Sequence, residues 1–366
     1  MTVSSSVLIV GGGPTGLTAA IELARRGLRP RIISRNEGPV HESRALGISR
    51  RLLDILAPSG ATARLREIGH RIRALNLRTA ERPLFRVPFP GADDPIPLLM
   101  ILPQSAIEQV LVETLRRLGV EVEWRTELRE LHLPATPRAN IRGPGGDEIL
   151  TPDIVIGADG AHSRTRHALG IGFPGGAYET DWGLADCRVE TDLALDEGHI
   201  FDLAPVLFVV LPIRENLVRF ICDQRDVLAH VPPGIAVKSV EWESGFRISH
   251  RQAETYQSGN VFLAGDAAHI HSPVGARGMN LGIEDAAWLA WMIASGTTEG
   301  YTKARWPVGR KVLKTVDPVT RLMASDAAPL RFARRHLLPR AIGITALRKR
   351  MIGRIIGLDT PAPPWL

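Results

Sequence analysis

Residues 259–286, GNVFLAGDAAHIHSPVGARGMNLGIEDA, combine residue types and spacings that suit the binding of an anionic or electron-rich ligand. A short apolar run predicts a buried strand that ends at Gly265-Asp266, where the chain must turn. A loop with little side-chain bulk follows, and a helical pattern begins at about Met279. These elements bring backbone N–H groups and a helix dipole to one place. The alternative is an ordinary strand–loop–helix corner in which glycine serves only tight packing.

A second candidate site lies near the start of the chain, where residues 11–16 read GGGPTG between a strand-like run and an apolar-periodic helix. This is the pattern G-x-G-x-x-G in the context that favours dinucleotide binding. Gly11 permits the tight turn, Gly13 lets a pyrophosphate approach the backbone, and Gly16 lets helix and strand pack closely. Pro14 suits a first helical turn, because its missing N–H costs nothing there.

The end of the second predicted strand, residues 31–33, departs from the dinucleotide pattern. An acidic residue that binds ribose hydroxyls usually stands there. In this chain the position holds Ser34, followed by Arg35, and Glu37 comes three residues later. Either Ser34 accepts a weaker hydrogen bond from the ribose, or Glu37 takes the place of the missing acid.

Two further residues lie where they could reach the same ligand. Arg44 follows the phosphate-binding turn and could pair with a pyrophosphate, although a lone loop arginine is usually a surface charge. Gln104 precedes a predicted helix, where its amide could reach a ligand or cap the helix. Ser105 and Glu108 form a capping-box pattern, which predicts that Ser105 caps this helix.

Asp159-Gly160 follows another buried-strand pattern, residues 154–158. Ligands of α/β proteins bind at the carboxyl ends of the strands, so the Asp159 carboxylate is a candidate ligand-binding group. His162 and Arg164 follow it as possible donors. An Asp-Gly turn without a ligand is the equally weighted alternative.

The order of strand and helix patterns predicts an α/β chain with one domain inserted into another. Residues 1–75, 100–172 and 259–366 are expected to form a Rossmann-like nucleotide-binding domain that ends in helices. Residues 76–99 and 173–258 lose helical periodicity and gain strand-like runs, which predicts an antiparallel β-sheet domain that binds the substrate.

Composition limits the class of protein. The 366 residues are 44% hydrophobic, enough for a large core, and no apolar run approaches the length of a membrane span. We expect no signal peptide and, with only two cysteines, no disulfide framework or metal site, which fits the cytoplasm. The net charge of +6 gathers near the end of the chain. A solvated helical face explains that basic segment more simply than anionic lipid or nucleic acid, and no aromatic stacking platform indicates nucleic-acid binding.

Taken together, the glycine motif at 11–16, Asp159-Gly160 and Gly265-Asp266 with its Pro–Gly loop resemble the FAD-dependent aromatic hydroxylases, single-component flavoprotein monooxygenases typified by p-hydroxybenzoate hydroxylase. The wording IGADGAHSRTR and FLAGDAAHIHSPVGARGMNLGIEDA is similar to the branch that acts on polyketides and related phenols. Some members carry a further thioredoxin-like domain, which we do not expect in this chain.

The resemblance implies that FAD pyrophosphate meets the glycines and Arg44, that Gln104 meets the ribityl or adenosine region, and that Asp159 serves both FAD and NAD(P)H. It implies that Asp266 binds the ribityl chain and that the loop after it follows the flavin ring. The cofactor-binding residues implied in this way are Gly11, Gly13, Pro14, Thr15, Gly16, Ser34, Arg35, Arg44, Gln104, Asp159, Gly265, Asp266, Pro273, Gly275, Gly278, Met279 and Asn280.

The activity implied is hydroxylation of an aromatic or polyketide-like substrate with O2 and NAD(P)H, through a C4a-hydroperoxyflavin. Baeyer–Villiger oxidation, epoxidation and a non-catalytic flavoprotein scaffold are the alternatives. No catalytic base is assigned, and a structural role is favoured for His269 over proton transfer. The oligomeric state stays open. Candidate pocket residues, each equally an ordinary sheet residue, are Tyr178, Trp182, His199, Phe208, Arg219 and Phe220.

Overall fold

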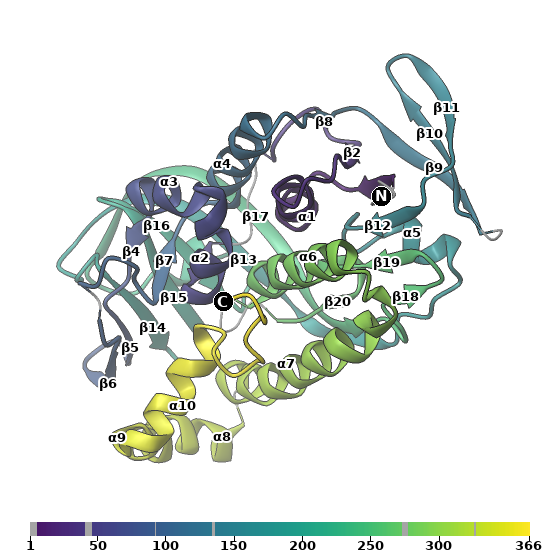
Figure 1. Cartoon of the computed structure of the whole chain (residues 1–366). Helices are drawn as coiled ribbons and strands as arrows, with labels where there is room; N and C mark the ends of the chain where they lie inside the picture. Colours follow the sequence, from purple (N-terminus) through teal and green to yellow (C-terminus); the bar gives the residue numbers. More distant parts are fainter. Residues whose placement is uncertain (1–5, 41–45, 92, 134–135, 273–276, 326) are drawn as a thin grey trace.

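The computed structural model describes residues 6–40, 46–91, 93–133, 136–272, 277–325 and 327–366. A six-stranded sheet forms the centre of the nucleotide-binding part, and its four inner strands run parallel (Figure 1). Because both faces are covered, the strand Val-Leu-Ile-Val of β1 is buried at every position. The strands, in spatial order, are β18 Gln257–Ser258, β19 Val261–Leu263, β12 Ile154–Gly157, β1 Val7–Val10, β2 Arg31–Ile33 and β8 Val122–Glu123.

Helix α1, Pro14–Ala24, packs between α4, Gln104–Arg117, and α6, Gly278–Ser295 (Figure 1). The apolar periodicity read from the sequence produces their shared core, in which Leu17 and Ile283 are fully buried. A three-stranded sheet leaves the centre beside the short α5, Arg164–Ala168. It consists of β9 Glu127–His132, β10 Arg138–Gly143 and β11 Gly146–Leu150.

The predicted middle sheet has eight strands and is antiparallel except at one pair. β14 runs parallel to β5, because the chain enters this sheet from the other part of the molecule twice. Its spatial order is β20 His269–Ile270, β17 Ile235–Gln252, β13 Gly175–Thr191, β16 Leu217–Cys222, β15 Leu207–Arg214, β14 Glu197–Asp202, β5 Ala74–Arg78 and β6 Pro83–Pro88. β20 follows Gly265-Asp266, so the middle sheet ends beside the candidate site.

The two faces of the middle sheet have different coverings. Phe208 and Phe220 lie on a face closed by the sheet's own loops and are fully buried in its core. Of the two alternatives left open for them, a place in the substrate pocket and an ordinary sheet position, this burial favours the second. The other face, which carries Trp182 and Ile248, packs toward the C-terminal helices.

A small fourth sheet joins the two parts. Its strands, in spatial order, are β3 Gly47–Ser49, β7 Leu99–Ile101 and β4 His70–Arg71. Between β3 and β4 the chain forms α2 Arg50–Leu56, the 3-10 turn η1 Ala57–Ser59 and α3 Ala61–Ile68. The capping-box prediction at the next helix is wrong: α4 begins at Gln104 after Pro103, and no side chain caps it. The carboxylate of Glu108 accepts instead from the side chain of Gln104 and from the Val40 N–H.

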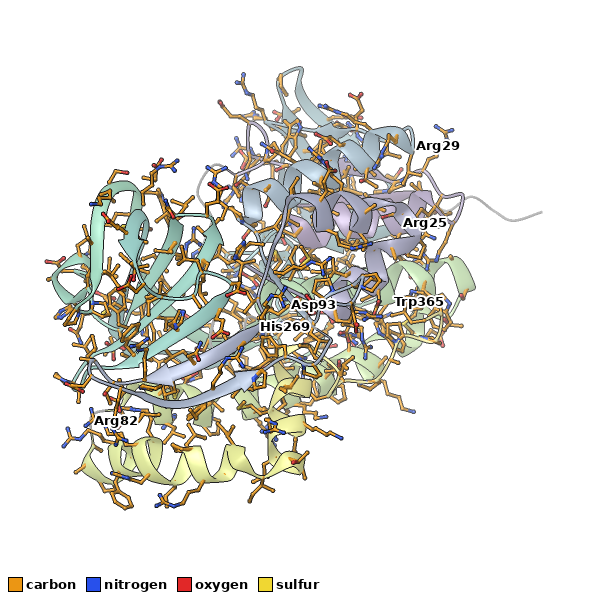
Figure 2. All side chains as sticks on the ribbon, turned by 90° about the vertical axis from the view of Figure 1, so that its left-hand side faces the viewer. Arg25, Arg29, Arg82, Asp93, His269 and Trp365 are labelled. Carbon is orange, nitrogen blue, oxygen red and sulfur yellow. The ribbon has the colours of Figure 1, made fainter. Side chains whose placement is uncertain are left out.

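The rest of the chain is helical, as the sequence indicated. It consists of the 3-10 turn η4 Thr298–Gly300, α7 Tyr301–Ala324, α8 Ala328–Phe332, the π-helical turn η5 Ala333–Leu337, α9 Leu338–Gly343 and α10 Thr345–Ile355. The last residues return to the first domain, where Trp365 packs on Trp288 and Trp291 of α6, and Arg26 lies over its ring. In Figure 2, Trp365 lies near Arg25 at the end of α1. Among the described residues, no helix is long and apolar enough to cross a membrane.

Candidate functional site

The glycine turn before α1 is shaped by contacts that only glycine allows. Gly11 has φ +117°, and a Cβ there would lie 2.2 Å from the carbonyl oxygen of Ala158. A Cβ on Gly16 would lie 1.8 Å from the carbonyl oxygen of Gly11. A Cβ on Gly13, by contrast, would meet no protein atom within 4 Å. Gly11 and Gly16 are therefore needed for packing, whereas Gly13 leaves open space in front of the helix.

The N-terminus of α1 is free to bind an anion. No side chain caps it, no acidic residue stands in its first turn, and Pro14 has no N–H to satisfy. The positive end of the helix dipole thus points into the space beside Gly13. Thr15 is turned away from that space, since its hydroxyl occupies the room that a Cβ on Gly265 or Gly282 would need.

Asp159 is already occupied by protein donors. Its carboxylate accepts hydrogen bonds from the Ser163 hydroxyl at 2.5 Å and from the Thr165 N–H at 3.0 Å, and so caps α5. Arg166, another possible donor that follows Asp159 in the sequence, is buried and donates to the carbonyl of Ala267 at 3.0 Å. Arg166 therefore ties the Asp159 segment to the Gly265-Asp266 turn. No local pattern marks this bond, because its partners lie 101 residues apart.

Asp266 lies in the 3-10 turn η3, Gly265–Ala267, and has no hydrogen-bond partner among the described residues. Its side chain is open to solvent, yet dense protein surroundings raise the pKa of its carboxyl, because partial desolvation penalises the charged form. His269 nearby acts in the opposite direction. Solvent access in dense surroundings indicates a carboxylate inside a recess, available to a ligand hydroxyl.

His269 begins a buried network of charges. Its Nε2 lies 2.6 Å from Asp285, which accepts from Arg305 at 2.7 Å, and Arg305 also bonds Glu284 at 2.7 Å. Burial alone would raise the pKa of Asp285, but Arg305 and His269 hold it below its ordinary value. The preference for a structural role of His269 fits this network. Figure 2 places His269 in the interior, where the two parts of the molecule meet.

His271 has one unused nitrogen. Its ring stacks on that of His269 at 6.2 Å between centroids, and its Nδ1 lies 3.0 Å from the carbonyl oxygen of Ser272. Nδ1 must carry the proton to donate to a carbonyl, so Nε2 holds a bare lone pair. Nε2 is buried and has no hydrogen-bond partner among the residues that the structure describes. Burial, with His269 and Arg277 nearby, lowers the pKa of His271 to about 4, so the ring is neutral at pH 7.

The start of α6 lies directly beside His271. A Cβ on Gly278 would lie 3.9 Å from the Cε1 atom of His271. No side chain caps this helix, and Arg277 before it bonds Asp359 at 2.8 Å and the carbonyl of Arg354 at 2.6 Å. The C-terminal residues thereby fix the start of α6.

Asn280 is used within the protein. Its Oδ1 accepts from the Ser49 N–H at 2.9 Å, and its Nδ2 donates to the carbonyl of Gly47 at 2.8 Å, so it links α6 to β3. Met279 is half-buried beside it. Pro273 and Gly275, which were expected along the flavin ring, lie outside the described residues, as does Arg44.

The end of β2 borders a hollow of about 440 Å³. Ser34 is buried there, and its hydroxyl accepts from the Asn36 N–H at 3.3 Å. A Cβ on Gly12 would lie 2.8 Å from that of Ser34, so Ser34 packs against the glycine turn and leaves no room for a side chain at position 12. Arg35 is exposed. The hollow is lined by Glu37, Gly38, Pro39, Val40, Ser105, Gln109 and Arg125.

Glu108 is a further residue of this region that the sequence reasoning treated only as a capping partner. Its side chain is 1% exposed and accepts from the Val40 N–H and from Gln104 Nε2, each at 2.8 Å. Burial raises the pKa of its carboxyl. Gln104 is thus tied to Glu108, and both residues support the chain segment that borders the hollow.

On the face of the middle sheet that packs toward the C-terminal helices, Arg219 is only 1% exposed. It bonds both oxygens of Asp186, at 2.6 and 2.7 Å, and lies 5.0 Å from the ring centre of Trp242. Its third nitrogen, Nη1, is buried without a partner. Tyr178 donates to Asp317 of α7, and His199 lies 2.9 Å from the carbonyl of Ala194, so both are engaged within the protein. The exposed His162 and Arg164 lie by α5.

The residues present fit FAD. The uncapped start of α1 and the space beside Gly13 suit a pyrophosphate, and the recessed Asp266 suits a ribityl hydroxyl. The uncapped start of α6 suits the electron-rich edge of a flavin ring. These three features come from segments that are distant in the sequence. The close packing of Gly11 on the carbonyl of Ala158 and the hydrogen bond from Arg166 to the carbonyl of Ala267 hold segments of the site together.

Comparison with known proteins agrees with this fit. The sequence pattern of a family described as the FAD binding domain matches residues 4–222 and 222–315. 6-Methylpretetramide 4-monooxygenase of Streptomyces rimosus is 33% identical over 349 residues, which cover 87% of this chain and 62% of that protein. Dialkyldecalin synthase of Streptomyces rugosporus is 30% identical over 397 residues, which cover 99% of this chain and 82% of that protein.

A solved structure, the OxyS anhydrotetracycline hydroxylase from Streptomyces rimosus, matches the fold with a TM-score of 0.82 and 28% identity, over 98% of this chain and 77% of that one. The chain therefore spans less than two thirds of the length of the 6-methylpretetramide 4-monooxygenase and about four fifths of the other two proteins.

Proposed function

The chain belongs to the family of FAD-dependent aromatic hydroxylases, and from that membership we propose that it is a monooxygenase acting on an aromatic or polyketide-like substrate. One observation carries the proposal. The uncapped start of α1, the Asp266 carboxylate and the uncapped start of α6 lie close together, and none of them is used by a hydrogen bond to a side chain of the described residues. Electrons come from NAD(P)H and the oxygen atom from O2. Use of the NAD(P)H pool places the reaction in the cytoplasm.

FAD, when bound, supplies the chemistry that side chains lack, namely acceptance of a hydride from NAD(P)H and activation of O2. The chain holds it at three points. The N–H groups at the start of α1 bind the pyrophosphate, and Asp266 accepts a hydrogen bond from a ribityl hydroxyl. The dipole of α6 stabilises negative charge on the ring, which also makes the ring easier to reduce.

Two buried nitrogens that lack a hydrogen-bond partner among the described residues, His271 Nε2 and Arg219 Nη1, supply polar contacts to the cofactor and the substrate. His271 Nε2 is a neutral acceptor, so it takes a hydrogen bond from an N–H or O–H group beside the start of α6. Arg219 Nη1 is a buried, charged donor between the middle sheet and the C-terminal helices, and it binds a carbonyl, phenolate or carboxylate oxygen of the substrate. A phenolic or quinone-like polyketide offers both kinds of group.

At the adenosine end, Glu37 takes the place of the usual ribose-binding acid. It lines the hollow beside β2, whereas Ser34 is buried and packed against the glycine turn. Arg125, 3.3 Å from Glu37, holds the carboxylate at the edge of that hollow.

The experiment is a turnover assay under 18O2. The FAD-loaded protein is mixed with NADPH or NADH and a panel of hydroxylated naphthoquinones and anthraquinones. We expect substrate-stimulated oxidation of the nicotinamide and a product that carries one atom of 18O. Nicotinamide oxidation that yields only hydrogen peroxide with every compound, and no labelled product, would contradict the proposal for this substrate class.

A second function is favoured by one comparison. The relative that is 30% identical over 397 residues is named a dialkyldecalin synthase. By analogy with that name, the chain would form the rings of a decalin instead of adding oxygen to its substrate. A linear polyene substrate would then give an isomeric product of unchanged mass without consumption of nicotinamide, an outcome that the same assay separates from oxygenation.

A further inference from the structure

The segment from residue 328 to residue 355 has an extreme charge composition. It holds eight basic residues and no acidic one, whereas the other 338 residues hold 37 basic and 39 acidic residues. The positive charge of the chain therefore resides in this segment. It forms α8, η5, α9 and α10, which make up one edge of the molecule below the middle sheet (Figures 1 and 2).

One face of this helical segment is fixed to the protein. Arg334 and Arg335 both bond Asp202 at 2.7 Å, and Arg334 is 3% exposed. Leu338 and Ile342 continue the same helical stripe at intervals of four residues and pack in the core beneath. The segment is therefore anchored by its inner side.

The opposite face is unpartnered and mixed in character. Phe332, His336 and Arg340 follow each other at intervals of four residues, two positions away from the inner stripe, which places them on the outer side. Phe332 is 57% exposed, and its ring lies 4.7 Å from that of His336. Leu330, Leu337, Ile344 and Leu347 are also exposed.

Five of the thirteen large apolar side chains that are exposed in the described part of the chain thus fall within eighteen residues. A solvated basic face, which the sequence favoured, gives no reason for such a cluster. We define the outer patch as Phe332, Leu337, Ile344 and Leu347 with the exposed basic residues Arg340, Lys349 and Arg350.

We propose that the outer patch binds the protein to the surface of a membrane rich in anionic lipid. Helices that lie in the plane of a membrane interface combine large apolar side chains with Lys and Arg, because the former enter the headgroup region and the latter meet anionic headgroups. Both kinds of residue stand here on one exposed, anchored edge. Nucleic acid phosphates would interact with the basic side chains of the patch but would leave its apolar side chains in water.

The test is sedimentation of the full FAD-loaded chain with lipid vesicles. Vesicles of phosphatidylcholine with 30% phosphatidylglycerol are compared with pure phosphatidylcholine at 0.1 M and 0.5 M NaCl. We expect binding to the anionic vesicles only, and weaker binding at high salt. Each basic residue near an anionic surface contributes about fivefold to binding, so reversal of three charges lowers the partition coefficient by about a hundredfold or more.

Two variants of the patch are compared with matched controls. The charge variant is R340E/K349E/R350E, and its control, with the same change in net charge on exposed residues elsewhere, is R29E/R116E/K303E. The apolar variant is F332S/L337S/I344S, and its control is I149S/V237S/V240S. We expect both patch variants to lose vesicle binding and both controls to keep most of it. Unchanged FAD content and urea midpoints show that folding is intact.

The proposal is overturned if wild-type protein stays in the supernatant with anionic vesicles, or binds neutral vesicles equally well. Equal loss of binding in the patch variants and their controls also overturns it, since general charge would then be responsible. Analytical ultracentrifugation gives another contrary outcome: a dimer that the apolar variant dissociates shows that the patch joins two copies of the chain. Patch-dependent binding of duplex DNA likewise assigns the surface to a different partner.

Discussion

Substitution of Gly13 by alanine separates ligand binding from folding. The backbone of Gly13 has φ −82° and ψ −177°, which alanine adopts without strain, and the added methyl group meets no protein atom within 4 Å. The free energy of unfolding should therefore stay the same or rise by about 0.4–1 kcal/mol, because alanine restricts the unfolded chain. The methyl group does, however, enter the space in which the pyrophosphate approaches the helix.

The cost to FAD binding follows from that crowding. A phosphate oxygen bonded to the backbone lies about 2.7–3.2 Å from a nitrogen, which leaves no room for a methyl group beside it. Forcing an extra methyl group into a filled site costs about 1–3 kcal/mol, which weakens binding by roughly 5- to 150-fold. The assay is titration of the apo-protein with FAD by quenching of flavin fluorescence, together with urea unfolding of the same sample.

Two other glycines serve as controls for Gly13→Ala. Gly145→Ala also adds a methyl group that meets nothing within 4 Å, but in the turn between β10 and β11, and should change neither quantity. Gly16→Ala places its Cβ 1.8 Å from the carbonyl oxygen of Gly11 and should destabilise the fold itself. If Gly13→Ala binds FAD within twofold of wild type, the pyrophosphate does not lie at the start of α1, and the reasoning is refuted.

Three further outcomes are expected. Asp266→Ala should raise the FAD dissociation constant by about one to two decades at an unchanged urea midpoint, because a charge-assisted hydrogen bond contributes about 1.5–3 kcal/mol; an unchanged dissociation constant removes Asp266 from the site. Glu37→Ala should weaken FAD up to about tenfold, whereas equal affinity means that Glu37 does not bind the ribose. Burial raises the pKa of Asp223 to about 6, so the folded state binds that proton more tightly and loses stability as pH rises through 6. Relative to Asp223→Asn, wild type should lose about 1–2 kcal/mol of unfolding free energy between pH 5 and pH 8; parallel pH profiles contradict the shift.

Local patterns sufficed to predict the elements that border the candidate site. The run before Gly11 became β1, the run before Asp159 became β12, and the periodicity after Arg277 became α6. Each signal lies within about fifteen residues, where apolar spacing and glycine placement act directly on the backbone. The same holds for the alternation that predicted the strands of the middle sheet.

What a side chain bonds to could not be predicted in the same way. Asp159 follows its strand as expected, but its carboxylate caps α5. The alternating strand pattern separates two faces of the middle sheet without indicating which face the loops close, and so it left open whether Phe208 and Phe220 face a pocket or a core. His271 Nε2 and Arg219 Nη1 are recognised as unpaired only when every neighbour in space is known. These properties depend on contacts between distant segments, which no local spacing records.

We propose that three segments of the chain, separated in the sequence, build one FAD site. The most direct test is equilibrium dialysis of the apo-protein against FAD, read from the flavin absorbance at saturation, followed by acid precipitation. We expect one FAD to bind per chain. We also expect the yellow colour to stay in the supernatant after precipitation, because the cofactor is bound without a covalent link. A folded protein that takes up no FAD, or one whose colour stays in the pellet, would contradict it.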